Sequence, residues 1–240
     1  MTLRIAFLGA SLIKGSISAP LPPRVVARLG RDDIQILNAG VNGDLAWNVA
    51  RRAPAVVAWK PDVVFILAGS NDVLASLTDG RARLYRLWKK LPQAPDSRFT
   101  RDSLNATFDA VRTVPHVIVG TLPPLGEDLD SIACVRVRET NEVIARAANE
   151  RGWSVADIYP AIAARIGPGG RPLPSRDHLV LSAALQRRIL RRSYESIART
   201  HGFRALSDGI HLTEGSGDVA ADVIVRAMPG SLQSRRSDSI

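Results

Sequence analysis

The sequence has a single cysteine, four histidines, few aromatic residues and no long hydrophobic segment. A lone cysteine, Cys134, excludes a disulfide within the chain and leaves no cysteine cluster for a metal ion. No apolar run approaches the ~20 residues that cross a bilayer, so we expect no membrane span. The residues after Met1 lack the basic start, apolar core and cleavage site of a secretory signal, so the expected location is the cytoplasm.

Acidic residues are outnumbered, with 23 Asp and Glu against 32 Lys and Arg and a formal net charge of +9. The basic residues are scattered except in "RRILRR", whose arginines are predicted to share one side of a helix: Arg187, Arg188, Arg191 and Arg192. No aromatic residues interleave with them as base-stacking platforms, and no nucleic-acid-binding motif accompanies them. We therefore expect a solvated surface and no nucleic-acid partner.

Short apolar runs alternate with segments of helical periodicity along the chain. The runs read as strands: "RIAFL", "IQIL", "VVFIL", "HVIVG" and "WSVAD". Apolar residues recur at helical spacing between them, over residues 44–59, 103–114 and 132–151. This alternation predicts an α/β protein of three α/β/α layers around a five-stranded, mainly parallel sheet, with all five runs in its centre.

The chain of 240 residues is long enough for one sizeable domain, which we expect over residues 1–230. Residues 73–100 and 165–205 interrupt the alternation and are interpreted as insertions. The last ten residues, 231–240, have little to bury and are expected to form a disordered tail.

The second insertion is predicted to hold a long amphipathic helix that begins near Asp177. Its apolar residues would form two rows: Leu181, Leu185 and Ile189, then Leu190, Tyr194 and Ile197. A further helix is expected after Thr213, whose hydroxyl can cap it. In the first insertion, Leu84, Leu87 and Trp88 could line an acyl or sugar pocket, but core packing is the favoured interpretation.

Small and polar residues follow three of the predicted strands, in "GAS", "NAGVNGD" and "AGSND". Ligands in an open parallel sheet sit beyond the carboxyl ends of the strands, so Ser11, Gly43 and Asn71 are expected to approach one crevice. Near the other end of the chain, "SDGIHLTEG" places Asp208 three residues before His211.

This set fits nucleophilic catalysis by a serine. The Ser11 hydroxyl needs a base that works near neutrality, and His211 is the candidate. Asp208 can hold the far nitrogen of the imidazole. The N–H groups of Ser11 and Gly43 and the side-chain amide of Asn71 can stabilise a developing oxyanion.

The motifs "GAS", "VNGD", "GSND" and "DGIH", in this order, resemble the four blocks of the SGNH hydrolases, the GDSL-like esterase and lipase superfamily. The resemblance covers about residues 4–227 and implies the flavodoxin-like SGNH hydrolase fold. It also implies Ser11 as nucleophile, Asp208 and His211 as the rest of the triad, and Ser11, Gly43 and Asn71 as the oxyanion hole. One residue departs from the pattern, because Ala10 stands where the family has aspartate. Activity is expected to survive this change, while substrate preference is left open.

The favoured function is a metal-independent and cofactor-free serine esterase that hydrolyses a small carboxylic ester through an acyl-enzyme. The acyl group would be acetyl or short, and carried by a carbohydrate or another metabolite. The alternatives are a lysophospholipase, a thioesterase, an acyltransferase with the same triad, or a carbohydrate- or lipid-binding protein without turnover. Each motif also has a purely structural interpretation. For Asp72 this interpretation is favoured: it is expected to form an Asx-turn or to cap the helix that follows it. Oligomeric state and any lid motion of the insertions are not encoded in these patterns.

Overall fold

The molecule is built on one sheet of five parallel strands in the order β2-β1-β3-β4-β5. The computed structural model describes residues 2–175 and 178–233. The strands are β1 (Leu3–Gly9), β2 (Ile34–Gly40), β3 (Val63–Leu67), β4 (His116–Gly120) and β5 (Ser154–Ala156). Each coincides with a predicted run, and this strand order is the flavodoxin-like one. The predicted fold class is therefore confirmed.

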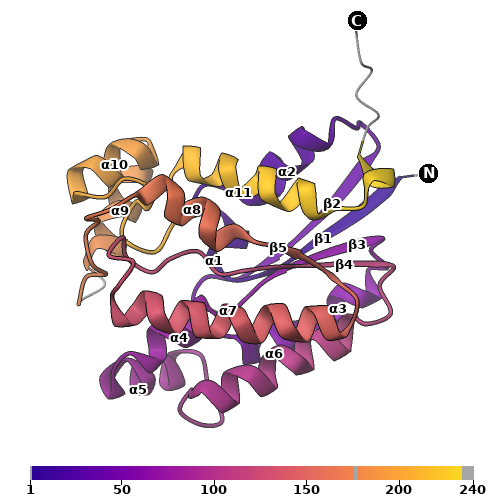
Figure 1. The fold of residues 1–240 in the computed structure, drawn as a ribbon, viewed down its shortest axis with the longest axis horizontal. Helices are drawn as coiled ribbons and strands as arrows, with labels where there is room; N and C mark the ends of the chain where they lie inside the picture. Colours follow the sequence, from indigo (N-terminus) through magenta and orange to yellow (C-terminus); the bar gives the residue numbers. More distant parts are fainter. Residues whose placement is uncertain (1, 176–177, 234–240) are drawn as a thin grey trace, which may run out of the picture.

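Helices cover both faces of the sheet (Figure 1). One layer contains α2 (Leu21–Leu29), α8 (Ile158–Ile166) and α11 (Glu214–Ala227). The opposite layer contains α3 (Ala46–Ala58), α6 (Ser97–Val111) and α7 (Ile132–Glu150). Their apolar stripes bury β1 and β3 from both sides, which is why these strands read as continuous hydrophobic runs. Thr213 caps α11 as predicted, accepting a hydrogen bond from the Ser216 N–H.

The expectation that all five runs are central strands is wrong for two of them. β2 and β5 lie at the two edges of the sheet. Ile36 of β2 consequently stays 46% exposed. Strand order depends on which runs pair through long crossovers, and the local pattern of each run does not carry that information.

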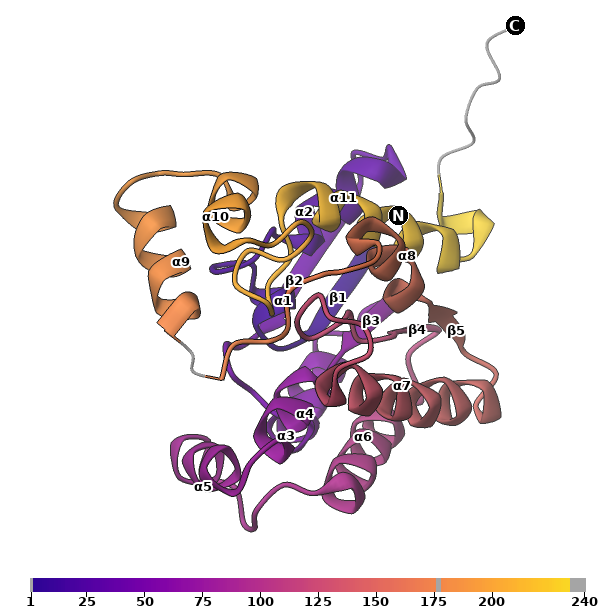
Figure 2. The ribbon, with the colours of Figure 1, turned by 60° about the vertical axis from the view of Figure 1, so that its left-hand side comes forward.

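The first insertion contains α4 (Ser70–Ser76) and α5 (Asp79–Trp88) and then a loop that leads into α6. Figure 2 shows α5 standing away from the helical layers. Three apolar side chains of α5 are more exposed than buried: Leu84, Leu87 and Trp88. The core-packing interpretation of these residues is therefore wrong: Leu84 and Leu87 are mostly exposed, and Trp88 lies half-exposed against Gly43 outside the core.

The second insertion holds two short helices in place of the predicted long one. These are α9 (His178–Arg188) and α10 (Tyr194–His201), and the predicted start at Asp177 lies outside the described residues. Arg191 has a left-handed φ of 50°, and Ser193 caps α10. Both features mark a turn between the helices. Tyr194 and Ile197 are buried, whereas the expected companions Leu181, Leu185, Ile189 and Leu190 are exposed.

The arginines of "RRILRR" consequently do not share one helical face. Arg187 and Arg188 end α9, while Arg191 and Arg192 lie in the turn that follows it. Arg192 donates hydrogen bonds to Gln186 Oε1, Ser196 Oγ and Thr200 Oγ1. It therefore ties α9 to α10 instead of lying free in solvent.

The remaining described elements are short. They are α1 (Ser11–Lys14) and the 3-10 helix η1 (Gly230–Leu232). Residues 234–240, most of the predicted tail, lie outside the described residues. Among the helices that the structure describes, none combines the length and apolarity needed to cross a membrane.

Candidate active site

Ser11 is the first residue of α1 and is separated from the carboxyl end of β1 by Ala10 alone. Two glycines let α1 approach so closely. A β-carbon on Gly9 would overlap the Leu67 carbonyl oxygen of β3 and the Ile13 side chain of α1, and one on Gly40 would overlap the backbone nitrogen of Lys14 in α1. Only glycine allows this approach of backbone to backbone. The small residues after β1 therefore let the chain turn sharply and present Ser11 at the edge of the sheet.

The ends of three strands lie level with one another. Gly9 pairs with Gly40 of β2 and with Leu67 of β3. The segments that follow these residues carry Ser11, Gly43 and Asn71, so all three start from the same edge of the sheet. The parallel register thus brings together three of the predicted site residues.

His211 reaches this edge from a loop between α10 and α11. Leu206 and Leu212 form an antiparallel bridge across the loop, and the Ser207 N–H donates to the His211 carbonyl at 2.7 Å. The Leu212 N–H donates to Ser18 Oγ at 3.1 Å, which fastens the loop to the segment after α1. The imidazole is therefore carried by a braced loop.

The three predicted catalytic side chains lie in one hydrogen-bonded line. His211 Nε2 lies 3.0 Å from Ser11 Oγ, and His211 Nδ1 lies 2.7 Å from Asp208 Oδ2. All three residues are buried, and Ser11 and His211 are 200 positions apart in the sequence. Asp208 can only accept when ionised, so it selects the tautomer with a proton on Nδ1. Nε2 is then free to accept the Ser11 hydroxyl proton.

The Asp208 carboxylate is stabilised by more than the imidazole. Its Oδ1 accepts the backbone N–H groups of Ile210 and His211, each at 2.9 Å. Burial opposes ionisation, but the charge of the His211 imidazolium and these hydrogen bonds outweigh it and hold the pKa of Asp208 below 3.8. Gly209, with φ of 90°, provides the tight turn that returns the chain to His211.

Asn71 lies in the first turn of α4, and its amide has a partner at each end. Nδ2 donates to the Asp44 carbonyl at 2.9 Å, and Oδ1 accepts the Tyr85 hydroxyl at 3.2 Å. The amide joins the loop that contains Gly43 to the segment after β3. Nδ2 retains a second hydrogen that can be offered to a ligand.

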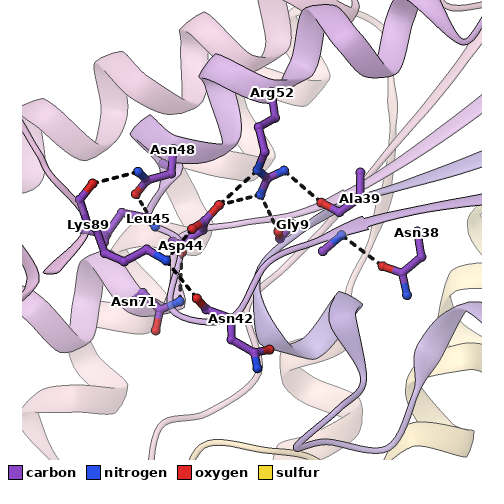
Figure 3. A network of polar contacts seen from close by, with 12 residues as sticks. Gly9, Asn38, Ala39, Asn42, Asp44, Leu45, Asn48, Arg52, Asn71 and Lys89 are labelled. Atoms are coloured by element: carbon purple, nitrogen blue, oxygen red, sulfur yellow. Dashed lines mark hydrogen bonds and ion pairs between the residues drawn. The ribbon is translucent and has the colours of Figure 1, made fainter.

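The loop after β2 is held by a charged network around Asp44 (Figure 3). The buried Asp44 carboxylate accepts from Arg52 Nη2 at 2.7 Å and pairs with Lys89 Nζ at 2.7 Å. Arg52 also donates to the carbonyls of Gly9 at 3.1 Å and Ala39 at 2.9 Å. One guanidinium therefore joins the ends of β1 and β2 to the loop that carries Gly43.

Asp72 acts on a different helix from the one that its position in the sequence suggests. Its Oδ2 accepts the Ala46 N–H at the start of α3 at 2.9 Å, and the Thr100 hydroxyl donates to Oδ1 at 3.4 Å. It caps α3, not the α4 helix in which it lies. Burial raises the pKa of Asp72 to about 7, although the hydrogen bond from Ala46 and others oppose that rise.

Glu127 is a supporting residue that lies outside the four sequence motifs. Its buried carboxylate accepts three successive backbone N–H groups where the His211 loop begins: Arg204 at 2.9 Å, Ala205 at 2.6 Å and Leu206 at 3.0 Å. Its partners lie more than 75 positions away, so no local spacing connects them to it. Arg52, Tyr85 and Lys89 were not identified from the sequence either.

Comparisons with known proteins bear on the family and the fold of the chain. The family model described as "GDSL-like Lipase/Acylhydrolase family" matches residues 7–214. The acetylxylan esterase Axe2 from Geobacillus stearothermophilus superposes with a TM-score of 0.68 at 16% identity, over 98% of this chain and 97% of that one. An acetyl xylan esterase, AlAXEase, superposes with a TM-score of 0.66 at 15% identity, over 95% of this chain and 100% of that one. At such identities the likeness shows a shared fold. A search of curated protein sequences found no match.

Proposed function

The chain belongs to the GDSL-like lipase and acylhydrolase family, whose members act on ester bonds, and from this premise we propose that it is a serine esterase working through an acyl-enzyme intermediate. The observation that carries the proposal is the hydrogen-bonded line from Ser11 through His211 to Asp208. A nucleophile, a base and an orienting acid in this order are the arrangement that activates a hydroxyl.

In the first half of the reaction, Ser11 Oγ attacks the carbonyl carbon of the ester while its proton passes to His211 Nε2. The tetrahedral intermediate then collapses as His211 returns that proton to the leaving alcohol oxygen. In the second half, water attacks the acyl-Ser11 carbonyl and gives a proton to Nε2. The carboxylic acid leaves as Ser11 recovers its proton. Asp208 stabilises the imidazolium in both halves, as its lowered pKa allows.

The negative oxygen of the intermediate would be bound by the N–H groups of Ser11 and Gly43 and by Asn71 Nδ2. Backbone donors in a tight turn and an amide already fixed at both ends need no reorganisation as charge develops. Gly43, with φ of 74°, has the left-handed conformation that turns the loop at this point.

The proposed substrate is a small carboxylic ester with an acetyl or short acyl group, carried by a carbohydrate. Two structural neighbours are acetylxylan esterases, which supports this class. The Trp88 ring, 56% exposed and packed against Gly43, gives the site an aromatic surface of the kind that sugars stack on.

Labelling with a fluorophosphonate tests the proposed nucleophile directly, because the reagent requires an activated serine. We expect the wild type to be labelled, Ser11→Ala to be unlabelled, and Ser154→Ala, an exposed serine of β5, to be labelled normally. Hydrolysis of p-nitrophenyl acetate by Ser11→Ala should fall by at least about 10⁴-fold. An unlabelled wild type would instead indicate a binding protein without turnover.

A panel of esters then tests the substrate class. Esters of increasing acyl length and acetylated xylo-oligosaccharides should show the highest kcat/KM for acetyl groups on sugars. A preference for long acyl chains or thioesters would contradict this class. Product release that depends on an added alcohol acceptor would identify an acyltransferase.

A further inference from the structure

The last turn of α5 contacts two segments that carry proposed oxyanion donors, the loop with Gly43 and the first turn of α4 with Asn71. Tyr85, Trp88 and Lys89 are spaced at i, i+3 and i+4 and therefore share one face of the helix and its C-terminus. The Tyr85 hydroxyl contacts Asn71 Oδ1. None of the four sequence blocks contains these residues, which all belong to the first insertion.

Lys89 and Trp88 both act on the loop after β2. Lys89 Nζ donates to the Asn42 carbonyl at 2.9 Å and pairs with Asp44 at 2.7 Å, so it holds the residues on both sides of Gly43 (Figure 3). The Trp88 ring occupies the space that a β-carbon on Gly43 would need. Lys89 and Trp88 therefore both restrict the conformation of this loop from α5.

Tyr85 has the more direct effect, because it contacts the amide itself. Asn71 can offer Nδ2–H to an oxyanion only when its amide is turned with Nδ2 toward the site and Oδ1 away from it. The Asp44 carbonyl accepts from Nδ2, and the Tyr85 hydroxyl satisfies Oδ1 at the opposite end. These two bonds restrict rotation of the amide about its side-chain torsion.

The hydroxyl is presented from a rigid and apolar surrounding. Tyr85 is buried in a small cluster with Leu45, Ala75 and Leu91, separate from the main core. Its ring also packs against Trp88, with centroids 5.6 Å apart. A hydrogen bond in such surroundings is stronger than one that competes with water.

We propose that Tyr85 is a positioning residue of the esterase, whose hydroxyl orients the Asn71 amide as an oxyanion donor. The first insertion then forms part of the catalytic scaffold. This inference rests on the proposed function, because it requires Asn71 to bind the oxyanion. It assigns Tyr85 no contact with substrate.

Tyr85→Phe is the test variant, since it removes the hydroxyl and keeps the buried ring. With p-nitrophenyl acetate, kcat should fall by about 5- to 20-fold, the loss of roughly one hydrogen bond, while KM changes by less than about two-fold. Tyr159→Phe is the matched control: its hydroxyl accepts from Arg138 on another helix, and kcat should stay at the wild-type value. Melting curves must accompany both, so that activity is measured on folded protein.

A double-mutant cycle separates positioning from general support. If Tyr85 acts through Asn71, adding Tyr85→Phe to Asn71→Ala should cause little further loss of kcat. Equal fold-losses in both backgrounds, or an unchanged kcat in the single variant, would overturn the inference. Should Tyr85→Phe not fold, Lys89→Met tests whether the same turn of α5 supports the loop after β2, and an unchanged kcat there would overturn the place of the first insertion in the catalytic scaffold. Ser11→Ala measured in parallel identifies a failure of the proposed function itself, since an active Ser11→Ala enzyme removes the premise.

Discussion

Asp72→Asn should make the protein less sensitive to pH, because Asp72 is a carboxyl group enclosed by the fold. Asparagine has nearly the same shape, and its Oδ1 can still accept the Ala46 N–H at the start of α3. Its amide can also meet the Thr100 hydroxyl. The substitution therefore removes the ionisation and leaves the cap of α3 in place.

The magnitude follows from the raised pKa. Burial raises the pKa of Asp72 from 3.8 to about 7, so the folded protein holds the proton more tightly than the unfolded chain does. The stability that Asp72 contributes is then fully present below pH ~4 and falls as pH rises toward about 7, by on the order of 4 kcal/mol in total. Roughly 2–3 kcal/mol of that fall should occur between pH 5 and pH 8. Asp72→Asn lacks this decline.

Urea unfolding followed by circular dichroism at pH 5, 6, 7 and 8 measures the difference. The free energy of unfolding of the wild type should fall relative to Asp72→Asn across this range, so that the variant is the more stable protein at pH 8. A constant difference between the two proteins from pH 5 to pH 8 would refute the reasoning. It would mean that Asp72 stays ionised in the folded state because the hydrogen bonds offset its burial.

Three further predictions concern the site itself. Asn71→Ala should lower kcat by ~100- to 1,000-fold with little change in KM, as measured by steady-state kinetics, because an oxyanion donor acts mainly in the transition state; an unchanged kcat would exclude that role. Asp208→Asn should lower kcat by about 10⁴-fold through loss of the correct imidazole tautomer, and a loss below about ten-fold would contradict this. The pKa of Asp208 is lowered in the folded state, so the stability that its ionisation contributes is present above pH ~4 and is lost on further acidification. Unfolding curves of the wild type and Asp208→Asn below pH 4 can detect this loss. Gly43→Ala should lower the free energy of unfolding, measured in urea, by about 1–2 kcal/mol because alanine is strained at the left-handed φ of this position. Adding Trp88→Ala to this variant should remove the clash with the Trp88 ring and leave the backbone strain in place.

The sequence determined the sheet and its main helices, since their patterns depend only on neighbouring residues. Strands buried on both faces read as apolar runs, and the helices between them have apolar residues that recur at the helical period of 3.6. The four motifs were also recognisable, because turns at strand ends need particular small and polar residues. These motifs predict the five site residues Ser11, Gly43, Asn71, Asp208 and His211. The first three are expected to lie together because parallel strands end at one edge of the sheet.

Tertiary structure decided what depends on contacts between distant segments. The second insertion illustrates this, because Leu181 and Leu185 continue the helical period toward Tyr194, yet the chain turns at Arg191 and buries only the second half. Arg52, Lys89 and Glu127 likewise have nothing in their own neighbourhoods to mark them, since their partners are other loops. The approach of His211 to Ser11 within 3.0 Å joins residues 200 positions apart. Such distances are fixed by packing between elements, whereas the sequence alone encodes the local preferences of each element.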